Sequence, residues 1–253
     1  MEKSVFELPH YMEINQKRED WLKRVLRDIS VAENLTNVID VGCGEGYFSN
    51  VLEKLGFKVT AIDGREGNVA NGKKKYPSIQ FKTANIESDD IGRIGNFELV
   101  LCLGLIYHLE NPFKAIRNLS AMTAKHCIIE TRIAPGKMPL AVMLDEFGKS
   151  DDQGIDYIAL IPSKSALVKM LYQAGFKNVY ESQGVPDHPE FKKGVLKYQR
   201  RTCLVASKGC LPGIADLKLL PEEKYSINWW SPWQSSWGYR RLMTLAKAVL
   251  KRK

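Results

Sequence analysis

The stretch VIDVGCGEGYF, residues 38–48, places three glycines directly after an apolar run. The segment NVIDV is rich in β-branched residues and ends at a glycine, which is typical of a buried strand that leads into a turn. The next stretch, EGYFSNVLEKLGF, has apolar residues at helical spacing and predicts an amphipathic helix. Glycine at Gly42, Gly44 and Gly46 permits left-handed backbone angles and close approach to a ligand. The sequence therefore predicts a strand–turn–helix unit whose turn holds a ligand.

Short apolar runs and amphipathic stretches alternate along most of the remaining chain. Further strands are predicted at KVTAID, IQFKTA, FELVLCLG and HCIIET, and helices at residues 69–76, 111–122 and 163–175. This alternation indicates an α/β fold, an open and mostly parallel doubly wound sheet with helices on both faces. The last two predicted strands, FKNVYES and RRTCLVASK, have no helix pattern between them, so we expect them to pair antiparallel at the sheet edge.

Three regions fall outside this alternation and define the expected domain organisation. We expect residues 1–36 to form a helical cap, residues 37–207 to form the ligand-binding domain, and residues 208–253 to form an extension. Within the domain, residues 132–162 and 183–199 are expected to be insertions on the substrate side, because long connections in such folds carry function.

Composition and charge narrow the class of protein. The net charge is +8, but residues 237–253 hold six Lys and Arg and no acid, so the remaining chain carries only +2. We therefore do not expect the main body to bind a large nucleic acid. No apolar run reaches the roughly 18 residues of a membrane span, and the first twenty residues have no apolar signal core, so we expect a cytoplasmic protein. The five scattered cysteines predict buried free thiols.

The charges around the glycine turn favour a cationic ligand over a dinucleotide. A dinucleotide fingerprint reads G-x-G-x-x-G, whereas here Tyr47 occupies the position of the third glycine. Asp40 and Glu45 flank the turn. Two carboxylates are unfavourable beside a pyrophosphate and favourable beside an ammonium and a sulfonium. The turn therefore points to S-adenosylmethionine.

Residues at the ends of the other predicted strands complete the expected cofactor site. Asp63 ends the second strand, where a carboxylate can accept both ribose hydroxyls. Asn85 and Ile86 follow the third strand, where they can meet the edge and the face of the adenine. The turn and the neighbouring strand ends supply the remaining expected cofactor contacts, which are Asp40, Gly42, Cys43, Gly44, Gly46, Gly64, Arg65, Leu103 and Tyr107.

Residues 36–130 resemble class I S-adenosylmethionine-dependent methyltransferases. The segments LGLIYHLENPFKAI, IIET, IPSKSALVKMLYQAGF and RRTCLVASK resemble the bacterial group related to the tRNA wobble-uridine carboxymethyl- and methyltransferases. The stretches INQKR, DGREGN and HPEF are similar to those of shorter bacterial methyltransferases associated with glycan synthesis. The resemblance covers about residues 10–207. It implies a Rossmann-like seven-stranded sheet with a reversed last strand, S-adenosylmethionine as cofactor, and methyl transfer.

The resemblance leaves the acceptor open. Tyr107 and Arg201 match, by motif position, a tyrosine and an arginine that contact a carboxylated cofactor in the wobble-uridine enzymes. The lysine-bearing segment of those enzymes is not evident, and only about 36 residues precede the cofactor domain in this sequence. We expect O-methylation of a small-molecule or glycan-type acceptor. The alternatives are a tRNA-modifying methyl- or carboxymethyltransferase, and a cofactor-binding scaffold without turnover.

Candidate catalytic residues lie at the ends of the fourth and fifth predicted strands. His108 is the leading candidate for a general base, which an oxygen nucleophile usually requires, and Tyr107 could orient the acceptor. Glu130 could bind an acceptor hydroxyl or pair with Arg132. Structural roles remain open for these residues, namely loop capping by His108 and packing by Tyr107.

The expected acceptor-binding residues are Arg132, His188 and Arg201. His188 lies in PDHPEF, where the combination of Asp187, His188 and Glu190 suggests a metal site. Because prolines break this short stretch and no second ligand group accompanies it, we expect no metal.

The C-terminal residues 229–253 combine two signals of a membrane surface. They hold four of the five tryptophans, followed by a pattern of apolar residues on one helical face and cations on the other. This pattern is typical of a helix lying in a membrane interface, so peripheral contact with an anionic membrane is a hypothesis for this segment. Packing of the tryptophans on the main body, or binding to RNA or a protein, are the alternatives.

Overall fold

The computed structural model of the chain describes residues 4–146, 150–192, 200–211 and 214–224. The chain divides into the units Met1–Glu222 and Glu223–Lys253, and the described secondary structure belongs to the first unit. Its elements are, in chain order, η1 (Val5–Glu7), α1 (Pro9–Ala32), β1 (Asn37–Val41), α2 (Tyr47–Lys54), β2 (Lys58–Asp63), α3 (Glu66–Lys75), β3 (Gln80–Thr83), η2 (Ile91–Ile94), β4 (Phe97–Leu103), η3 (Ile106–His108), α4 (Pro112–Met122), β5 (Thr123–Arg132), β6 (Ala141–Asp145), β7 (Ile158–Pro162), α5 (Lys164–Gln173), β8 (Asn178–Ser182), η4 (Pro189–Phe191), β9 (Arg201–Ser207) and β10 (Leu217–Leu220).

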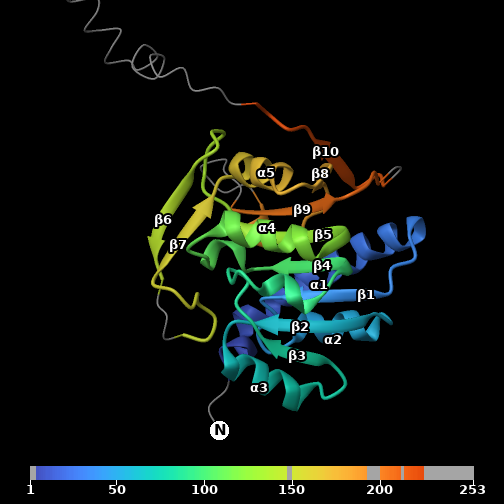
Figure 1. Cartoon of the computed structure of the whole chain (residues 1–253), viewed down its shortest axis with the longest axis vertical. Helices are drawn as coiled ribbons and strands as arrows, with labels where there is room; N and C mark the ends of the chain where they lie inside the picture. The colour runs from blue at the N-terminus through green and yellow to red at the C-terminus, as the bar shows by residue number, and fades with distance from the viewer. Residues whose placement is uncertain (1–3, 147–149, 193–199, 212–213, 225–253) are drawn as a thin grey trace, which may run out of the picture. The chain divides into compact units, whose positions relative to one another are not determined.

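The central sheet has eight described strands in the order β10-β8-β9-β5-β4-β1-β2-β3 (Figure 1). The strands from β3 to β5 pair parallel, and β9 runs antiparallel to both β5 and β8. The predicted mostly parallel sheet with a reversed last strand is therefore confirmed. The strand order changes direction at β1 and β4, and ligands of such sheets bind beyond the carboxyl ends of the strands at this point.

Two apolar layers cover the two faces of the sheet. Side chains alternate along the strands, so that Leu99 and Leu101 of β4 join one cluster and Val100 and Cys102 join the other. Helices α1, α2 and α3 cover the first face, and α4 and α5 cover the second. Trp21 of α1 is fully buried and donates from its indole Nε1 to Ser182 Oγ on β8 at 3.0 Å. Helix α1 is thus an integral part of the core.

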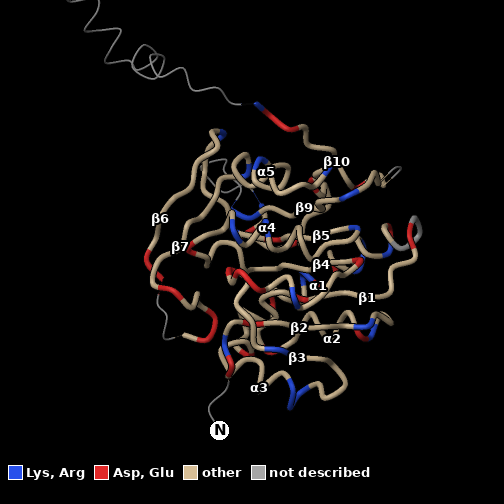
Figure 2. The backbone as a smooth tube through the Cα atoms, in the orientation of Figure 1, with Lys and Arg blue, Asp and Glu red and all other residues tan. Residues whose placement is uncertain are grey.

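Two elements differ from the sequence-based expectation. Strand β10 comes from the segment expected to be an extension, yet it pairs antiparallel with β8 and forms the sheet edge. The insertion at 132–162 holds an antiparallel hairpin of β6 and β7, separate from the central sheet. All five residues of β6 are exposed. The acidic residues of this insertion gather at the loop that joins the two strands (Figure 2).

The glycine turn joins β1 to α2 through left-handed backbone. Gly42, Gly44 and Gly46 have φ angles of 72°, 54° and 89°. The main-chain N–H groups of Gly42 and Cys43 donate to Ile62 O at 2.9 and 3.0 Å, which fixes the turn beside the end of β2. A Cβ atom added at Gly46 would lie 2.5 Å from the Phe81 ring. Glycine is therefore required at Gly46 both for its backbone angle and for lack of space.

We expect Gly46→Ala to destabilise the protein by about 2–4 kcal/mol, because left-handed strain adds to a steric clash. Gly56→Ala is a matched control, since Gly56 has a φ of 92° but open space around it. That variant carries only the strain, about 1–2 kcal/mol. Urea denaturation of the two variants measures the difference, and equal losses would contradict the packing argument.

Candidate active site

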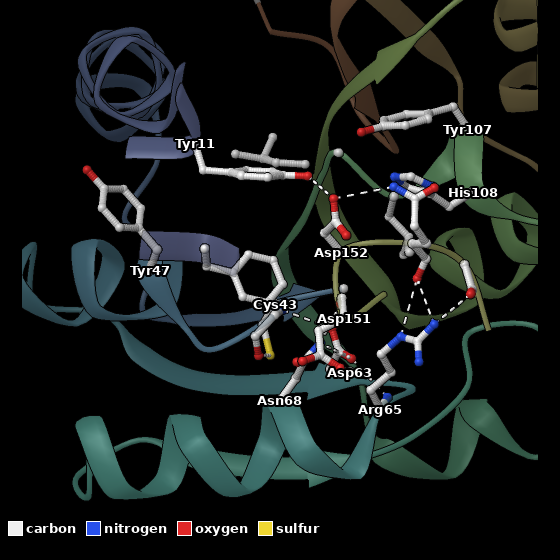
Figure 3. A pocket seen from close by; sticks show the side chains of 18 of the residues that line it. Tyr11, Cys43, Tyr47, Asp63, Arg65, Asn68, Tyr107, His108, Asp151 and Asp152 are labelled. Atoms are coloured by element: carbon white, nitrogen blue, oxygen red, sulfur yellow. Dashed lines mark hydrogen bonds between the residues drawn. The ribbon is translucent and has the colours of Figure 1, made fainter. Parts of the chain in front are cut away.

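A cavity of about 800 Å³ lies at the carboxyl ends of the parallel strands. Its lining comes from α1, from the glycine turn, from the ends of β2 and β4, and from residues 144–146 and 151–155. In Figure 3, Asp63, Arg65 and Asn68 lie together, and Tyr107 and His108 lie apart from them. The volume suits a drug-sized cofactor together with part of a small acceptor.

Asp63 is the polar centre of the cofactor side. Its Oδ2 accepts from the main-chain N–H of Gly44, and its Oδ1 accepts from Arg65 N, both at 2.9 Å. Asn68 Nδ2 donates to Oδ1 as well, at 3.2 Å. Burial raises the pKa of Asp63 more than these hydrogen bonds lower it. A carboxylate has about four acceptor positions, so one remains for a ribose hydroxyl. The site therefore fits the nucleoside of S-adenosylmethionine.

The segment 150–154 is hydrogen-bonded to the cofactor side of the cavity. Arg65 donates from its guanidinium to the carbonyls of Gln153 and Gly154, at 3.3 and 2.7 Å. Asn68, which contacts Asp63, also donates to Asp151 O at 3.2 Å. Arg65 and Asn68 therefore connect the strand end that carries Asp63 to the loop between β6 and β7.

A buried ionic network lies beside Tyr107. Glu130 is fully buried, and its two carboxylate oxygens lie 2.9 Å from Arg18 of α1 and Arg201 of β9. Arg201 also contacts Glu190 at 2.5 Å and donates to the Tyr107 hydroxyl at 3.3 Å. The three guanidinium nitrogens of Arg201 thus each have a protein partner.

His108 is paired with a carboxylate that the sequence analysis did not identify. Its Nδ1 lies 3.0 and 3.1 Å from the two oxygens of Glu146, in the residues after β6. The His108 and Tyr107 rings are tilted against each other with centroids 4.0 Å apart. The sequence analysis also missed Tyr11, which donates to Asp152. The only sequence signal for these contacts is the acidic composition of residues 145–152.

Most of the predicted site residues line this one cavity. The structure brings together Gly42, Cys43, Gly44, Asp63, Gly64, Arg65, Asn85, Ile86, Leu103, Tyr107, His108, Arg132, His188 and Arg201. Asp40, Gly46 and Glu130 do not line the cavity. Asp40 lies beneath the turn, 2% exposed, and accepts from Ser49 Oγ at 2.6 Å. Gly46 is the residue directly before α2. Glu130 forms ion pairs with Arg18 and Arg201 rather than with Arg132.

The two carboxylates that flank the turn are less available to a cation than the sequence suggested. Glu45 lines the cavity, but it forms an ion pair with Lys75 and accepts from Asn71 Nδ2 at 2.9 Å. Burial raises the pKa of Glu45, but the contacts with Lys75, Ser4 and Asn71 together lower it further, so the pKa lies below its ordinary value. The carboxylate is therefore ionised, and Lys75 compensates its charge.

The predicted acceptor-binding residues Arg132 and His188 have local partners. Arg132 pairs with Glu190 at 3.1 Å, and His188 Nδ1 accepts from the Glu190 main-chain N–H at 3.3 Å. Asp187 pairs with Lys192.

Within the described ranges there is no group of three or more His, Cys, Asp or Glu that could hold a metal ion. No helix in the described part of the chain is long and apolar enough to cross a membrane. Residues 229–253, for which membrane contact was predicted, lie outside the described residues.

A family model described as a methyltransferase domain matches residues 10–181. The chain therefore belongs to this methyltransferase domain family, and its fold is that of the S-adenosylmethionine-dependent class.

Individual proteins similar to this chain include two curated relatives and one solved structure. The chain is 35% identical over 101 residues to the ubiquinone biosynthesis O-methyltransferase of Rickettsia conorii, covering 38% of this chain and 33% of that protein. It is 28% identical over 149 residues to the tRNA U34 carboxymethyltransferase of Campylobacter jejuni, covering 55% and 49%. The chain thus spans between a third and a half of these curated relatives. The N-terminal domain of EvdMO1, crystallised in the presence of SAH and D-fucose, has a similar fold, with 18% identity, a TM-score of 0.62, and coverage of 76% and 83%.

Asp40 gives a prediction about pH and stability. Burial raises its pKa from 3.8 to about 7. Between about pH 4 and pH 7 the folded protein therefore binds more protons at Asp40 than the unfolded chain, so wild-type stability falls as pH rises. The side chain of Asp40→Asn does not titrate. The free energy of unfolding of this variant, relative to that of wild type, should therefore rise by roughly 2–4 kcal/mol between pH 4 and pH 7. Urea denaturation of both proteins from pH 4 to pH 8 measures it, and parallel pH curves would show that Asp40 titrates normally.

Proposed function

We propose that the protein transfers the methyl group of S-adenosylmethionine to a hydroxyl oxygen of a small, glycan-type acceptor. The observation that carries this proposal is one cavity that holds the Asp63 cofactor site and His108 together. A nucleophile must lie in line with the methyl group at close range, and a shared cavity allows this. The name of the Rickettsia relative, an O-methyltransferase, supports an oxygen acceptor.

The side chains around Tyr107 and His108 support a polar acceptor. The lining of the cavity also includes His10, Tyr11, Asn15, Arg132 and His188, which offer hydrogen bonds and aromatic faces. Sugar hydroxyls need such partners when they leave water. The EvdMO1 structure obtained in the presence of D-fucose lends further support to a sugar acceptor.

In this proposal the protein orients the acceptor and accepts one proton. S-adenosylmethionine supplies, when bound, an activated methyl group whose bond to sulfur breaks as the bond to oxygen forms, with the electron pair remaining on sulfur. His108 accepts the proton of the attacking hydroxyl. Glu130 is not a candidate for this role, because it is fully buried and paired with Arg18 and Arg201.

Carboxymethyl transfer to tRNA is a second candidate function. The proximity of Arg201 to the Tyr107 hydroxyl, 3.3 Å, favours it, because these residues match those that contact a carboxylated cofactor in the resembling group. The full pairing of Arg201 with Glu130 and Glu190 argues against it, since a further carboxylate would have to displace one of them.

Transfer of radiolabel from methyl-labelled S-adenosylmethionine into separated glycan, lipid, small-molecule and RNA pools tests the proposed function. We expect label in the glycan or small-molecule pool, stable to mild base as an ether is. Label in purified tRNA, with turnover that falls steeply as salt rises, would establish the second candidate instead.

The cofactor site yields a binding prediction. Asp63→Ala should weaken S-adenosylmethionine binding by about 1.5–3 kcal/mol, because it removes a charged acceptor of a ribose hydroxyl. Glu45→Gln, in the glycine turn, is the matched control, because Lys75 already neutralises Glu45. That variant should change the affinity by less than about 0.5 kcal/mol. Isothermal titration calorimetry compares the variants, and unchanged affinity in Asp63→Ala would refute the assignment.

His108 yields a kinetic prediction. His108→Ala should lower kcat by roughly 10²–10⁴-fold while the calorimetric affinity for S-adenosylmethionine stays within about twofold, because only the proton acceptor is lost. Turnover that survives in this variant would place the base elsewhere.

A further inference from the structure

The carboxylate of Glu146 holds one side of the His108 imidazole ring. Both carboxylate oxygens lie within hydrogen-bonding distance of Nδ1, at 3.0 and 3.1 Å. The two side chains are nearly buried, with exposed fractions of 12% for His108 and 9% for Glu146. The Glu146 carboxylate is itself fixed, because its Oε2 accepts from the main-chain N–H of Gly154 at 2.8 Å.

The charge state of Glu146 decides where the imidazole carries its hydrogen. Burial raises the pKa of Glu146, but the hydrogen bonds from His108 and from Gly154 N–H outweigh it, so the pKa lies below the ordinary value. An ionised carboxylate only accepts hydrogen bonds, so the hydrogen of a neutral imidazole must be at Nδ1. The opposite nitrogen, Nε2, is then an acceptor.

We propose that Glu146 is a positioning residue that holds His108 as the Nδ1–H tautomer, with Nε2 free to accept the proton of the acceptor hydroxyl. The catalytic part of this inference rests on the proposed function. In the reaction the oxygen–methyl bond forms, the methyl–sulfur bond breaks, and the hydroxyl proton moves to Nε2. The ring then carries a positive charge, which the Glu146 carboxylate stabilises.

The contacts of the surrounding loop separate this role from a purely structural one. The segment 150–154 has anchors of its own, since Arg65 donates to Gly154 O at 2.7 Å and Asn68 donates to Asp151 O at 3.2 Å. Tyr11 donates to Asp152. An amide oxygen at position 146 could still accept from Gly154 N–H. Glu146→Gln should therefore remove the charge without releasing the loop.

The tautomer of His108 can be measured without knowing the acceptor. The chain has four histidines, so ¹⁵N-labelled imidazole signals can be assigned by comparison with His108→Gln. In wild type we expect the neutral ring to show a protonated Nδ1 and a bare Nε2. In Glu146→Gln we expect a mixture of tautomers, because an amide can donate as well as accept. Asp152→Asn, which changes a carboxylate of the same loop, should leave the His108 signals unchanged.

Kinetics with the acceptor pool that takes up label complete the test. Glu146→Gln should lower kcat by about 10²-fold or more with unchanged cofactor affinity, and Glu146→Asp should restore part of the rate. A wild-type tautomer together with full turnover in Glu146→Gln would overturn the inference. If His108→Ala keeps its turnover while the tautomer depends on Glu146, the proposed base is wrong and the placement of the hydrogen by Glu146 still holds.

Discussion

The buried charge of Glu130 is the constraint on which the packing of α1 and β9 around Tyr107 depends. A carboxylate with no exposed surface must be paired, because an uncompensated charge in the interior costs several kcal/mol. Arg18 compensates it from α1 and Arg201 from β9, so the N-terminal helix and the reversed strand are fixed at the same point. Arg201 then contacts the Tyr107 hydroxyl, which links this pairing to the cavity.

A second set of contacts connects the cofactor side to the proposed proton acceptor. Asn68 contacts both Asp63 and the main chain of Asp151. The same loop presents the Gly154 N–H to Glu146, whose carboxylate reaches His108. Asp63 and His108 are thus linked by hydrogen bonds at both ends of residues 151–154, whose main chain joins the two sets. Asp63 and His108, at the two ends of this series, line the same cavity.

Local sequence patterns predicted the central sheet well and the additions to it poorly. The β-branched runs and the helical spacings located the parallel strands and their helices, because burial on both faces leaves a strong local signal. Strand β10 has only four residues, too few for a periodic pattern, and it is a strand because β8 offers a free edge. Strand β6 is exposed along its whole length, so its apolar residues show no alternation between core and solvent.

The sequence by itself determined the glycine turn, Asp63 at the end of β2, and the position of His108 after β4. These features depend on backbone angles and on strand ends, which neighbouring residues specify. Only the tertiary structure decided that Asp40 and Glu130 lie outside the cavity, that Lys75 neutralises Glu45, and that Glu146 contacts His108. Those pairings join residues from separate elements, and their partners are set by how the helices and the β6–β7 hairpin pack, which leaves no trace in local spacing.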